Sequence, residues 1–157
     1  MYRSKNYLFI AFLLLGMVTK SQDNSAYQAP PKDIMDLVLA KPTPAVTIDK
    51  KAEWMLLMER SDYPTIEELA QPELRIGGLR INPNNFSPSR SSSYSNLQLK
   101  NIKNGKLLDI EGLPKEPRIM NVQWSHDQSR IAFLHSGNTE VDLYVFDISD
   151  RKARKVN

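Results

Sequence analysis

Residues that usually carry catalysis are scarce in this sequence. The chain has two histidines, His126 and His135, and no cysteine, a combination that does not predict a zinc site. A serine nucleophile of the α/β-hydrolase type would need a Gly-x-Ser-x-Gly elbow, but no two of the six glycines are four residues apart. We therefore expect no catalytic residue, no metal site and no cofactor. The strand pattern places His126 in a turn and His135 at the end of a strand, and we expect structural roles for both.

The elements that would position a functional side chain are short strands, which are clearest at the C-terminal end. Residues 119–157 contain four short apolar runs separated by Ser, Asp, Gly and Asn. Each run is too short for a stable helix and is rich in β-branched and aromatic residues, as strands are. Four consecutive antiparallel strands in about 40 residues are typical of one β-propeller blade. The predicted fold class is therefore all-β, a partial β-propeller of about two four-stranded blades.

An internal repeat predicts the other blade. The apolar pattern of residues 46–58 recurs 76 residues later, and that of residues 97–102 recurs 46 residues later. The difference between the two offsets corresponds to about 30 extra residues between the second and third strands of the first unit. We predict a first blade over residues 45–114, interrupted by an insertion at 61–90, and a second blade over residues 115–157.

The insertion has the most distinctive local signals. Thr65 and Glu68 form a capping-box pattern, which predicts a short helix, and Pro72 ends it. Gly77 and Gly78 allow the backbone to turn or to approach a neighbour closely. Residues 79–81 alternate as a strand does, and an Asn- and Pro-containing turn follows.

Two ordered strings of residues resemble the prolyl oligopeptidase family. Trp124-Ser125-x-Asp127 followed by Ile-Ala-Phe at 131–133 is similar to the propeller signature Trp-Ser-Pro-Asp-Gly…Ile-Ala-Phe, with His126 and Gln128 replacing Pro and Gly. The string from Glu59 to Arg90, which includes Glu-Arg-x-x-Tyr-Pro and Gly-Leu-Arg-Ile-Asn-Pro, resembles the N-terminal propeller segment of the glutamyl-endopeptidase-like branch. The resemblance runs from about Tyr27 to the end of the chain.

The resemblance implies that this chain takes part in proteolysis but does not itself carry the catalytic residues. Family members are serine peptidases whose propeller covers an α/β-hydrolase domain, and only the propeller half is matched here. It implies that the chain gates the access of peptides in a parent enzyme, with peptide substrates and a separate catalytic domain or complementary chain as partners. The alternative is a stand-alone periplasmic propeller-like module that binds a peptide or protein without catalysis.

The same resemblance implies three substrate-binding residues, Arg75, Arg80 and Arg90. A glutamate-preferring site needs a cation, and guanidinium groups bind carboxylates well. The alternative is that these arginines form ion pairs with the glutamates close to them in the sequence, which are Glu67, Glu68 and Glu73.

The N-terminal residues predict export. Arg3 and Lys5 precede an apolar run over residues 8–18, and small residues follow at Thr19 and Ser21. This is the pattern of a secretory signal peptide over residues 1–21, with cleavage after Ser21, and it predicts a secreted or periplasmic protein. The alternative is an uncleaved anchor, although the run is short for a permanent span.

Residues 22–44 are expected to form a leader with a short amphipathic helix over residues 32–40, where Ile34, Leu37 and Val38 have helical spacing. The chain carries 21 Lys and Arg against 18 Asp and Glu. Three of those cations and no acid lie in residues 1–21, so the remainder is neutral. This balance does not predict a nucleic-acid partner or, apart from export, a membrane partner.

A two-blade piece should leave apolar faces without a partner, because each propeller blade packs against two neighbours. The large aromatic residues are expected between strands and between blades. We expect Phe133, Tyr144 and Phe146 at or near the unpartnered faces. Trp54 and Trp124 should pack in the core.

Overall fold

The computed structural model describes residues 29–60 and 63–157. The predicted signal peptide, residues 1–21 with cleavage after Ser21, lies outside the described residues, as do residues 22–28 of the predicted leader. Contacts divide the chain into two units, residues 1–40 and residues 41–157.

The first unit contributes one helix, α2 (Lys32–Val38). The Pro31 carbonyl oxygen accepts hydrogen bonds from the N–H groups of Ile34 and Met35, both at 3.0 Å. The short helix predicted over residues 32–40 is confirmed, with its end two residues earlier. Within the described parts of the chain, none of the helices has the length and apolar character needed to cross a membrane.

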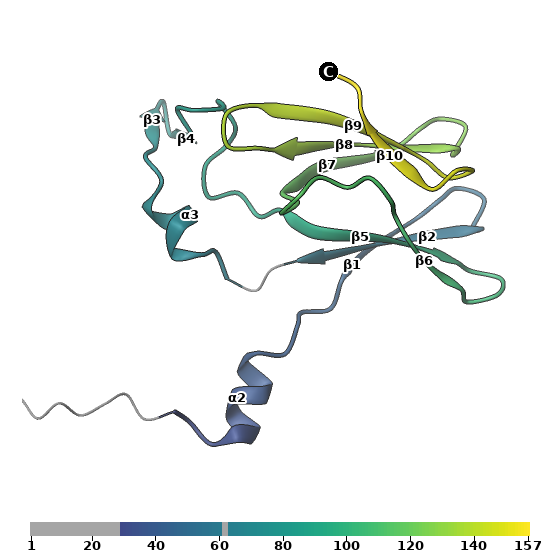
Figure 1. Cartoon of the computed structure of the whole chain (residues 1–157), viewed down its shortest axis with the longest axis horizontal. Coiled ribbons are helices and arrows are strands. Elements are labelled where there is room, and N and C mark those ends of the chain that lie inside the picture. Colours follow the sequence, from purple (N-terminus) through teal and green to yellow (C-terminus); the bar gives the residue numbers. More distant parts are fainter. Residues whose placement is uncertain (1–28, 61–62) are drawn as a thin grey trace, which may run out of the picture. The chain divides into compact units, whose positions relative to one another are not determined.

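The second unit is built mainly from antiparallel strands, so the all-β prediction is confirmed. Its eight main strands belong to one hydrogen-bonded sheet that divides into two groups of four, which are stacked in Figure 1, and we call each group a sheet. The first sheet has the order β1 (Ala45–Ile48), β2 (Trp54–Arg60), β5 (Tyr94–Asn101), β6 (Leu107–Asp109). The second sheet has the order β7 (Ile119–Trp124), β8 (Arg130–Ser136), β9 (Val141–Asp147), β10 (Lys152–Lys155).

The ladders of the two sheets meet at a single residue pair, Tyr94 with Ile119 in β5 and β7. An isolated parallel bridge between Glu111 and Lys152 also joins them. The described residues therefore form an open pair of sheets rather than a closed ring.

Strand pairing follows the two sequence offsets residue by residue. Ile48 pairs with Met55 in the first sheet, and Trp124 pairs with Ile131 in the second, each 76 residues later. The β2–β5 and β8–β9 ladders are related in the same way. Residues of β8 lie 76 positions after their equivalents in β2, and residues of β9 lie 46 positions after their equivalents in β5. The two sheets are thus structural repeats in the same register.

The turns repeat as well. Asp49 Oδ1 accepts the Trp54 backbone N–H at 2.9 Å in the β1–β2 turn, and Ser125 Oγ accepts the equivalent Arg130 N–H at 2.9 Å in the β7–β8 turn. Polar side chains at the same repeat position therefore close both turns.

The core lies between the two sheets and consists of side chains that alternate along the strands. Leu56, Leu97 and Leu99 of the first sheet are fully buried, as are Ile131 and Phe146 of the second. Ile119 and Phe133 bring the number of fully buried side chains to seven. Each contributes about 1.5–3 kcal/mol on burial, so the contact between the sheets stabilises the fold.

The expectation that Phe133, Tyr144 and Phe146 lie at or near an unpartnered face is wrong. Phe133 is 1% exposed and Phe146 is 0% exposed. Phe133 stacks on Tyr144 with 5.4 Å between ring centroids. Phe133, Tyr144 and Phe146 all lie on the face of the second sheet that the first sheet covers. The sequence could not show which face would be covered, because both faces of the second sheet are apolar.

The sheets stack head to tail. We call the face of the first sheet that carries Leu56 and Leu99 face A, and this face is covered. Face A of the second sheet carries the repeat equivalents Ala132 and Val145 and is uncovered. The opposite face, face B, is covered in the second sheet, where it carries Ile131 and Phe133, and uncovered in the first, where it carries Met55 and Leu57.

The insertion emerges between β2 and β5 and contains α3 (Ile66–Ala70), β3 (Leu74–Ile76) and β4 (Leu79–Ile81). The predicted capping box is confirmed: Thr65 Oγ1 accepts the Glu68 N–H at 3.1 Å, and Glu68 Oε2 accepts the Thr65 N–H at 3.0 Å. Strand β3, which the sequence reading missed, pairs with β4 in a hairpin. Gly77 and Gly78 form its turn with φ of 58° and 86°, values that favour glycine.

Candidate functional site

The insertion is fixed to the second sheet by buried polar side chains. Asn85 Nδ2 donates to the Gly137 carbonyl oxygen at 2.6 Å and to Ser136 Oγ at 3.1 Å. Ser87 Oγ lies 3.0 Å from Ser136 Oγ. Asn85 and Ser87 are only 8% and 6% exposed. Asn85 and Ser87 thereby hold the insertion against the end of β8, about 50 residues further along the chain.

A second set of bonds stiffens the turn that follows β4. Asn82 Nδ2 donates to Gln71 Oε1 at 3.1 Å, and Asn82 N–H donates to the Ser87 carbonyl oxygen at 2.9 Å. Phe86 lies at the tip of this turn with φ of 57°, and the residue is 78% exposed. The anchored neighbours of Phe86 hold this unusual backbone conformation in place.

Glu73 gathers the three arginines predicted to bind substrate. Its Oε1 lies 2.9 Å from Arg75 Nη2 and 2.9 Å from Arg80 Nη1, and its Oε2 lies 3.2 Å from Arg90 Nε. Ser89 Oγ donates to Oε2 at 3.1 Å. Only 10% of the Glu73 side chain is exposed, whereas the arginine side chains are 46–69% exposed. The structure therefore pairs all three arginines with Glu73, which is the alternative that the sequence left open, and brings them together around one carboxylate.

This cluster has a net positive charge, because three guanidinium groups share one carboxylate. Burial by itself would raise the pKa of Glu73, but hydrogen bonds from Arg75 and Ser89 and the charges of Arg80 and Arg90 lower the pKa below its usual value. Glu73 is therefore ionised at neutral pH and orients the arginines.

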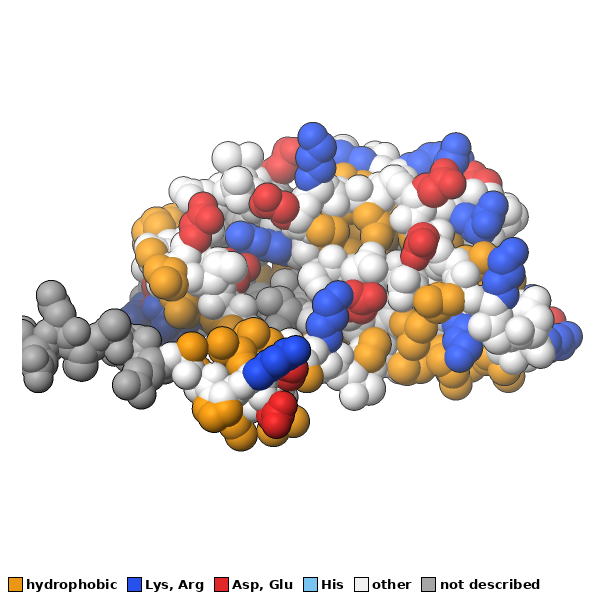
Figure 2. Space-filling model, turned by 60° about the horizontal axis from the view of Figure 1, so that its bottom comes forward, with side chains coloured by type: hydrophobic (Ala, Val, Ile, Leu, Met, Phe, Trp, Pro, Cys, Tyr) orange, Lys and Arg blue, Asp and Glu red, His pale blue; other side chains and the backbone are white. Residues whose placement is uncertain are grey.

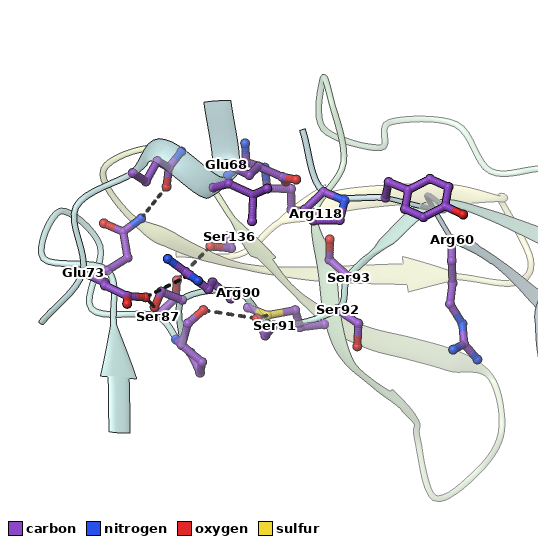
Figure 3. A pocket seen from close by; sticks show the side chains of 18 residues that line it. Arg60, Glu68, Glu73, Ser87, Arg90, Ser91, Ser92, Ser93, Arg118 and Ser136 are labelled. Atoms are coloured by element: carbon purple, nitrogen blue, oxygen red, sulfur yellow. Dashed lines mark hydrogen bonds and ion pairs between the residues drawn. The ribbon is translucent and has the colours of Figure 1, made fainter. Parts of the chain in front are cut away.

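A cavity of about 310 Å³ opens beside the cluster, between the insertion and the second sheet. Figure 3 shows its lining, in which serines at 91–93 face Arg118 and Glu68. Of the three predicted arginines only Arg90 lines the cavity. Arg75 and Arg80 are cross-strand partners in the exposed β3–β4 hairpin and do not line it.

Two other arginines line the cavity, and the sequence reading missed both. Arg118 Nε lies 3.4 Å from Glu68 Oε1, which ties the start of β7 to α3. Arg60, at the end of β2, lies over the Tyr94 ring with 5.8 Å between its Cζ and the ring centroid. No motif marks either residue, because they reach the cavity only through the pairing of β2, β5 and β7.

An adjoining hollow of about 520 Å³ shares Arg60 and Ser91–Ser93 with the first cavity and continues past Phe86 to Leu134 and Val141. Together the two hollows form a groove with an arginine-rich end and an apolar end. Such a groove could hold an extended peptide that carries an acidic side chain.

Neither histidine lines either of the two cavities. His126 is exposed in the β7–β8 turn. His135 is 8% exposed, and its Nδ1 accepts the Arg118 backbone N–H at 3.3 Å. Among the residues that the structure describes, His, Asp and Glu side chains form no cluster able to hold a metal ion.

Comparison with known proteins finds relatives that are named as peptidases. The chain is 33% identical over 139 residues to a probable chloroplastic glutamyl endopeptidase from Arabidopsis thaliana, and 29% identical over 138 residues to the one from Oryza sativa subsp. japonica. The matches cover 83% and 82% of this chain. No protein-family profile matches the chain, and no solved structure matches it.

The chain spans only 14% and 15% of the length of these two relatives. It therefore corresponds to a small, β-rich part of proteins that are named as glutamyl endopeptidases. The relatives support a peptidase-related origin.

Proposed function

We propose that this chain is the N-terminal propeller portion of an exported serine peptidase of the prolyl oligopeptidase family, of the glutamyl-endopeptidase-like branch. In the parent enzyme it forms part of the wall that peptides pass on their way to the active site. The catalytic domain would be supplied by further sequence or by a complementary chain.

The observation that carries this proposal is the head-to-tail stacking of two four-stranded sheets in the same register. Heterologous stacking of equivalent units continues in one direction and can close into a ring, which is the principle of a propeller. Similarity to two glutamyl endopeptidases over most of the chain supports the same conclusion.

Arg90 is the proposed contact for an acidic peptide side chain. It lines the cavity, and Glu73 holds its Nε while other nitrogen atoms of the guanidinium remain available. Arg75 and Arg80 complete the predicted substrate-binding set from the hairpin, where they pair with Glu73 and add positive charge.

Peptide binding tests this assignment. Two labelled peptides that differ only in Glu or Gln at one position would be titrated against the full chain, and fluorescence anisotropy would report binding. We expect tighter binding of the Glu peptide and a loss of that preference in Arg90→Met. Arg130→Met is the matched control, because Arg130 pairs with Asp147 in the second sheet and lies outside the cavity. Equal binding of both peptides by the wild type would refute the assignment.

Catalysis requires a second test. We expect the purified chain to show no turnover of a glutamyl peptide, because the sequence contains no Gly-x-Ser-x-Gly elbow. Turnover that a serine-directed inhibitor abolishes would contradict the proposal that the catalytic residues lie in a separate domain or chain.

The second candidate function is a stand-alone periplasmic module that binds a peptide or protein without catalysis, and the groove is compatible with it. Sequencing the gene beyond the codon for Asn157 separates the two candidates. Further repeats and a Gly-x-Ser-x-Gly in the adjacent frame favour a truncated or split peptidase. An intergenic region favours the module.

Export is part of both candidates. Cleavage after Ser21 would release a secreted or periplasmic protein. N-terminal sequencing of the exported product should begin at Gln22, and a membrane-bound product that retains Met1 would contradict this.

A further inference from the structure

The cavity beside the Glu73 cluster carries more positive charge than its own carboxylates neutralise. Among the described residues, its charged lining consists of three arginines and two glutamates, which are Arg60, Arg90, Arg118, Glu68 and Glu73. Glu73 also pairs with Arg75 and Arg80, which lie outside the cavity. Five arginines in and around the cavity therefore stand against two glutamates, and an anionic ligand would balance the excess.

Arg90 and Arg118 are held in the cavity in the same way, each by a separate glutamate. Arg90 Nε lies 3.2 Å from Glu73 Oε2, and Arg118 Nε lies 3.4 Å from Glu68 Oε1. Because both contacts use Nε, the terminal nitrogens of each guanidinium can donate hydrogen bonds to a ligand. The Arg118 side chain is 30% exposed and that of Arg90 is 46% exposed. Arg118 is therefore the better shielded of the two, and solvent screens its attraction to an anion less.

The position of Arg118 is fixed by the second sheet and by α3. Its backbone N–H donates to His135 Nδ1 at 3.3 Å, and its carbonyl oxygen accepts the Ser136 N–H at 3.0 Å. Its partner Glu68 is held by the capping box, in which Glu68 Oε2 accepts the Thr65 N–H at 3.0 Å. A side chain that is oriented before a ligand arrives loses little freedom on binding. Arg118 therefore forms a binding point of its own, on a different element from Arg90.

The excess positive charge is local to the cavity. Figure 2 shows Lys and Arg side chains interspersed with Asp and Glu over the face that it displays. The chain after residue 21 has equal numbers of cations and acids, so its overall charge does not attract acidic peptides. At the cavity wall, the hydroxyl groups of Ser92 and Ser93 (Figure 3) are further donors for carboxylate oxygens. The cavity lining therefore suits acidic groups better than the displayed surface does.

We propose that the cavity binds a peptide with two acidic side chains, at positions i and i+2, one held by Arg90 and the other by Arg118. Side chains two residues apart in an extended peptide lie on the same side, so both can face the cavity. Two carboxylates also balance more of the excess charge than one does. This inference rests on the proposed function, in which Arg90 binds one acidic side chain, and adds Arg118 as a second specificity-determining residue.

Four labelled peptides of one frame test the proposal, with Glu-x-Glu, Glu-x-Gln, Gln-x-Glu or Gln-x-Gln at the two positions. Fluorescence anisotropy would measure their binding to the full chain. The wild type should bind Glu-x-Glu about tenfold more tightly than either single-Glu peptide, as expected for one added charge-assisted contact. Arg118→Met should lose the gain from the second Glu and retain the preference for one Glu over none. Arg130→Met is the matched control, because Arg130 pairs with Asp147 outside the cavity.

Glu68→Gln separates binding from folding. Glutamine at this position preserves the capping box with Thr65 but removes the negative charge beside Arg118. The variant should bind Glu-x-Glu more tightly than the wild type, by about threefold. Loss of structure cannot explain opposite effects of Arg118→Met and Glu68→Gln on the same peptide, and far-UV circular dichroism checks that both variants are folded.

The outcomes distinguish this inference from the proposed function. Tighter binding of one Glu than of none, without a gain from the second, would overturn the diacidic site and leave the assignment of Arg90 intact. Equal binding of all four peptides would refute both. A gain from the second Glu that persists in Arg118→Met, or a Glu68→Gln variant that binds Glu-x-Glu no more tightly than the wild type, would overturn the role of Arg118.

Discussion

Gln128 joins the turns of the two sheets: its Oε1 accepts the Lys50 backbone N–H at 3.0 Å. Its Nε2 donates to the Ser125 carbonyl oxygen at 2.6 Å within its own turn. The backbone of Gln128 has φ of 64°, a conformation that costs a non-glycine residue about 1–2 kcal/mol. Gln128 occupies the place of the glycine in the resembled propeller signature, so its side chain compensates for backbone strain by linking the sheets.

Two substitutions of Gln128 separate these effects. Gln128→Ala should destabilise the chain, because it removes the hydrogen bonds and keeps the strain. Gln128→Gly should cost about 1 kcal/mol less, since it removes the same bonds but relieves the positive φ. Denaturant unfolding measures both, and equal midpoints for the two variants would show that the strain is negligible.

The equivalent position in the first sheet is the control. Ala52 has φ of 53°, is exposed, and lies 76 residues before Gln128. Ala52→Gly relieves strain without removing a side-chain hydrogen bond, and we expect stabilisation by about 1 kcal/mol or slightly less. A destabilised Ala52→Gly would contradict the repeat of turn geometry.

Trp124 and His126 are close in sequence and should differ in their contribution to stability. Trp124 packs against the core and donates a hydrogen bond to Thr47 across the sheets. Trp124→Ala should therefore lower the free energy of unfolding by about 3 kcal/mol, the lower end for a large aromatic residue. His126→Ala, in an exposed turn, should stay within about 0.5 kcal/mol. Equal denaturation midpoints would exclude the packing role of Trp124.

His135 should make stability depend on pH. Burial lowers its pKa; the Asp142 carboxylate opposes this effect, and the charges of Arg118 and Lys155 reinforce it. The unfolded chain therefore binds this proton at a higher pH than the folded chain does. The free energy of unfolding should fall as the pH drops from about 6.5 through the lowered folded-state pKa.

Thermal melts between pH 7.5 and 5 would measure this dependence. His135→Gln should reduce the slope, and His126→Gln is the control because that side chain is exposed in a turn. An unchanged slope in His135→Gln would show that other groups account for the acid sensitivity.

Asn85 should hold the insertion in place. Asn85→Ala removes the hydrogen bonds that its Nδ2 donates to Ser136 and Gly137 and the one that its Oδ1 accepts from the Ser87 N–H, at a cost of about 1–3 kcal/mol. We expect faster proteolysis within residues 63–93, measured by limited digestion and mass spectrometry. Asn84→Ala is the matched control, because Asn84 is exposed in the same turn. Equal digestion of both variants would mean that Asn85 does not anchor the insertion.

Local signals in the sequence predicted most of the strands and the helices. A short apolar run identified β8, the internal repeat identified β2, and the capping box of Thr65 and Glu68 identified α3. These features depend on residues close together in the chain, where propensity and spacing act directly. The two repeat offsets could be read from the sequence for the same reason.

The cavity beside the Glu73 cluster could not be predicted in full, because some of its residues come together only through long-range contacts. Residues within 73–90 cluster around Glu73 because a hairpin and a turn fold them together, and this much could be anticipated. Arg60 and Arg118 join the cavity from separate strands, and no local pattern connects them. Asn85 reaches Ser136 only in the folded chain.

Two similar antiparallel units with an insertion in the first could be predicted from the sequence, because short apolar runs, turn residues and capping are local properties. Which face of each sheet is covered depends on the tertiary structure. Alternation places Phe133 and Phe146 on one side of a sheet with two apolar faces, but the choice between those faces depends on how the other sheet stacks. That stacking is set by packing across long sequence distances, and it also decides which arginines reach the cavity.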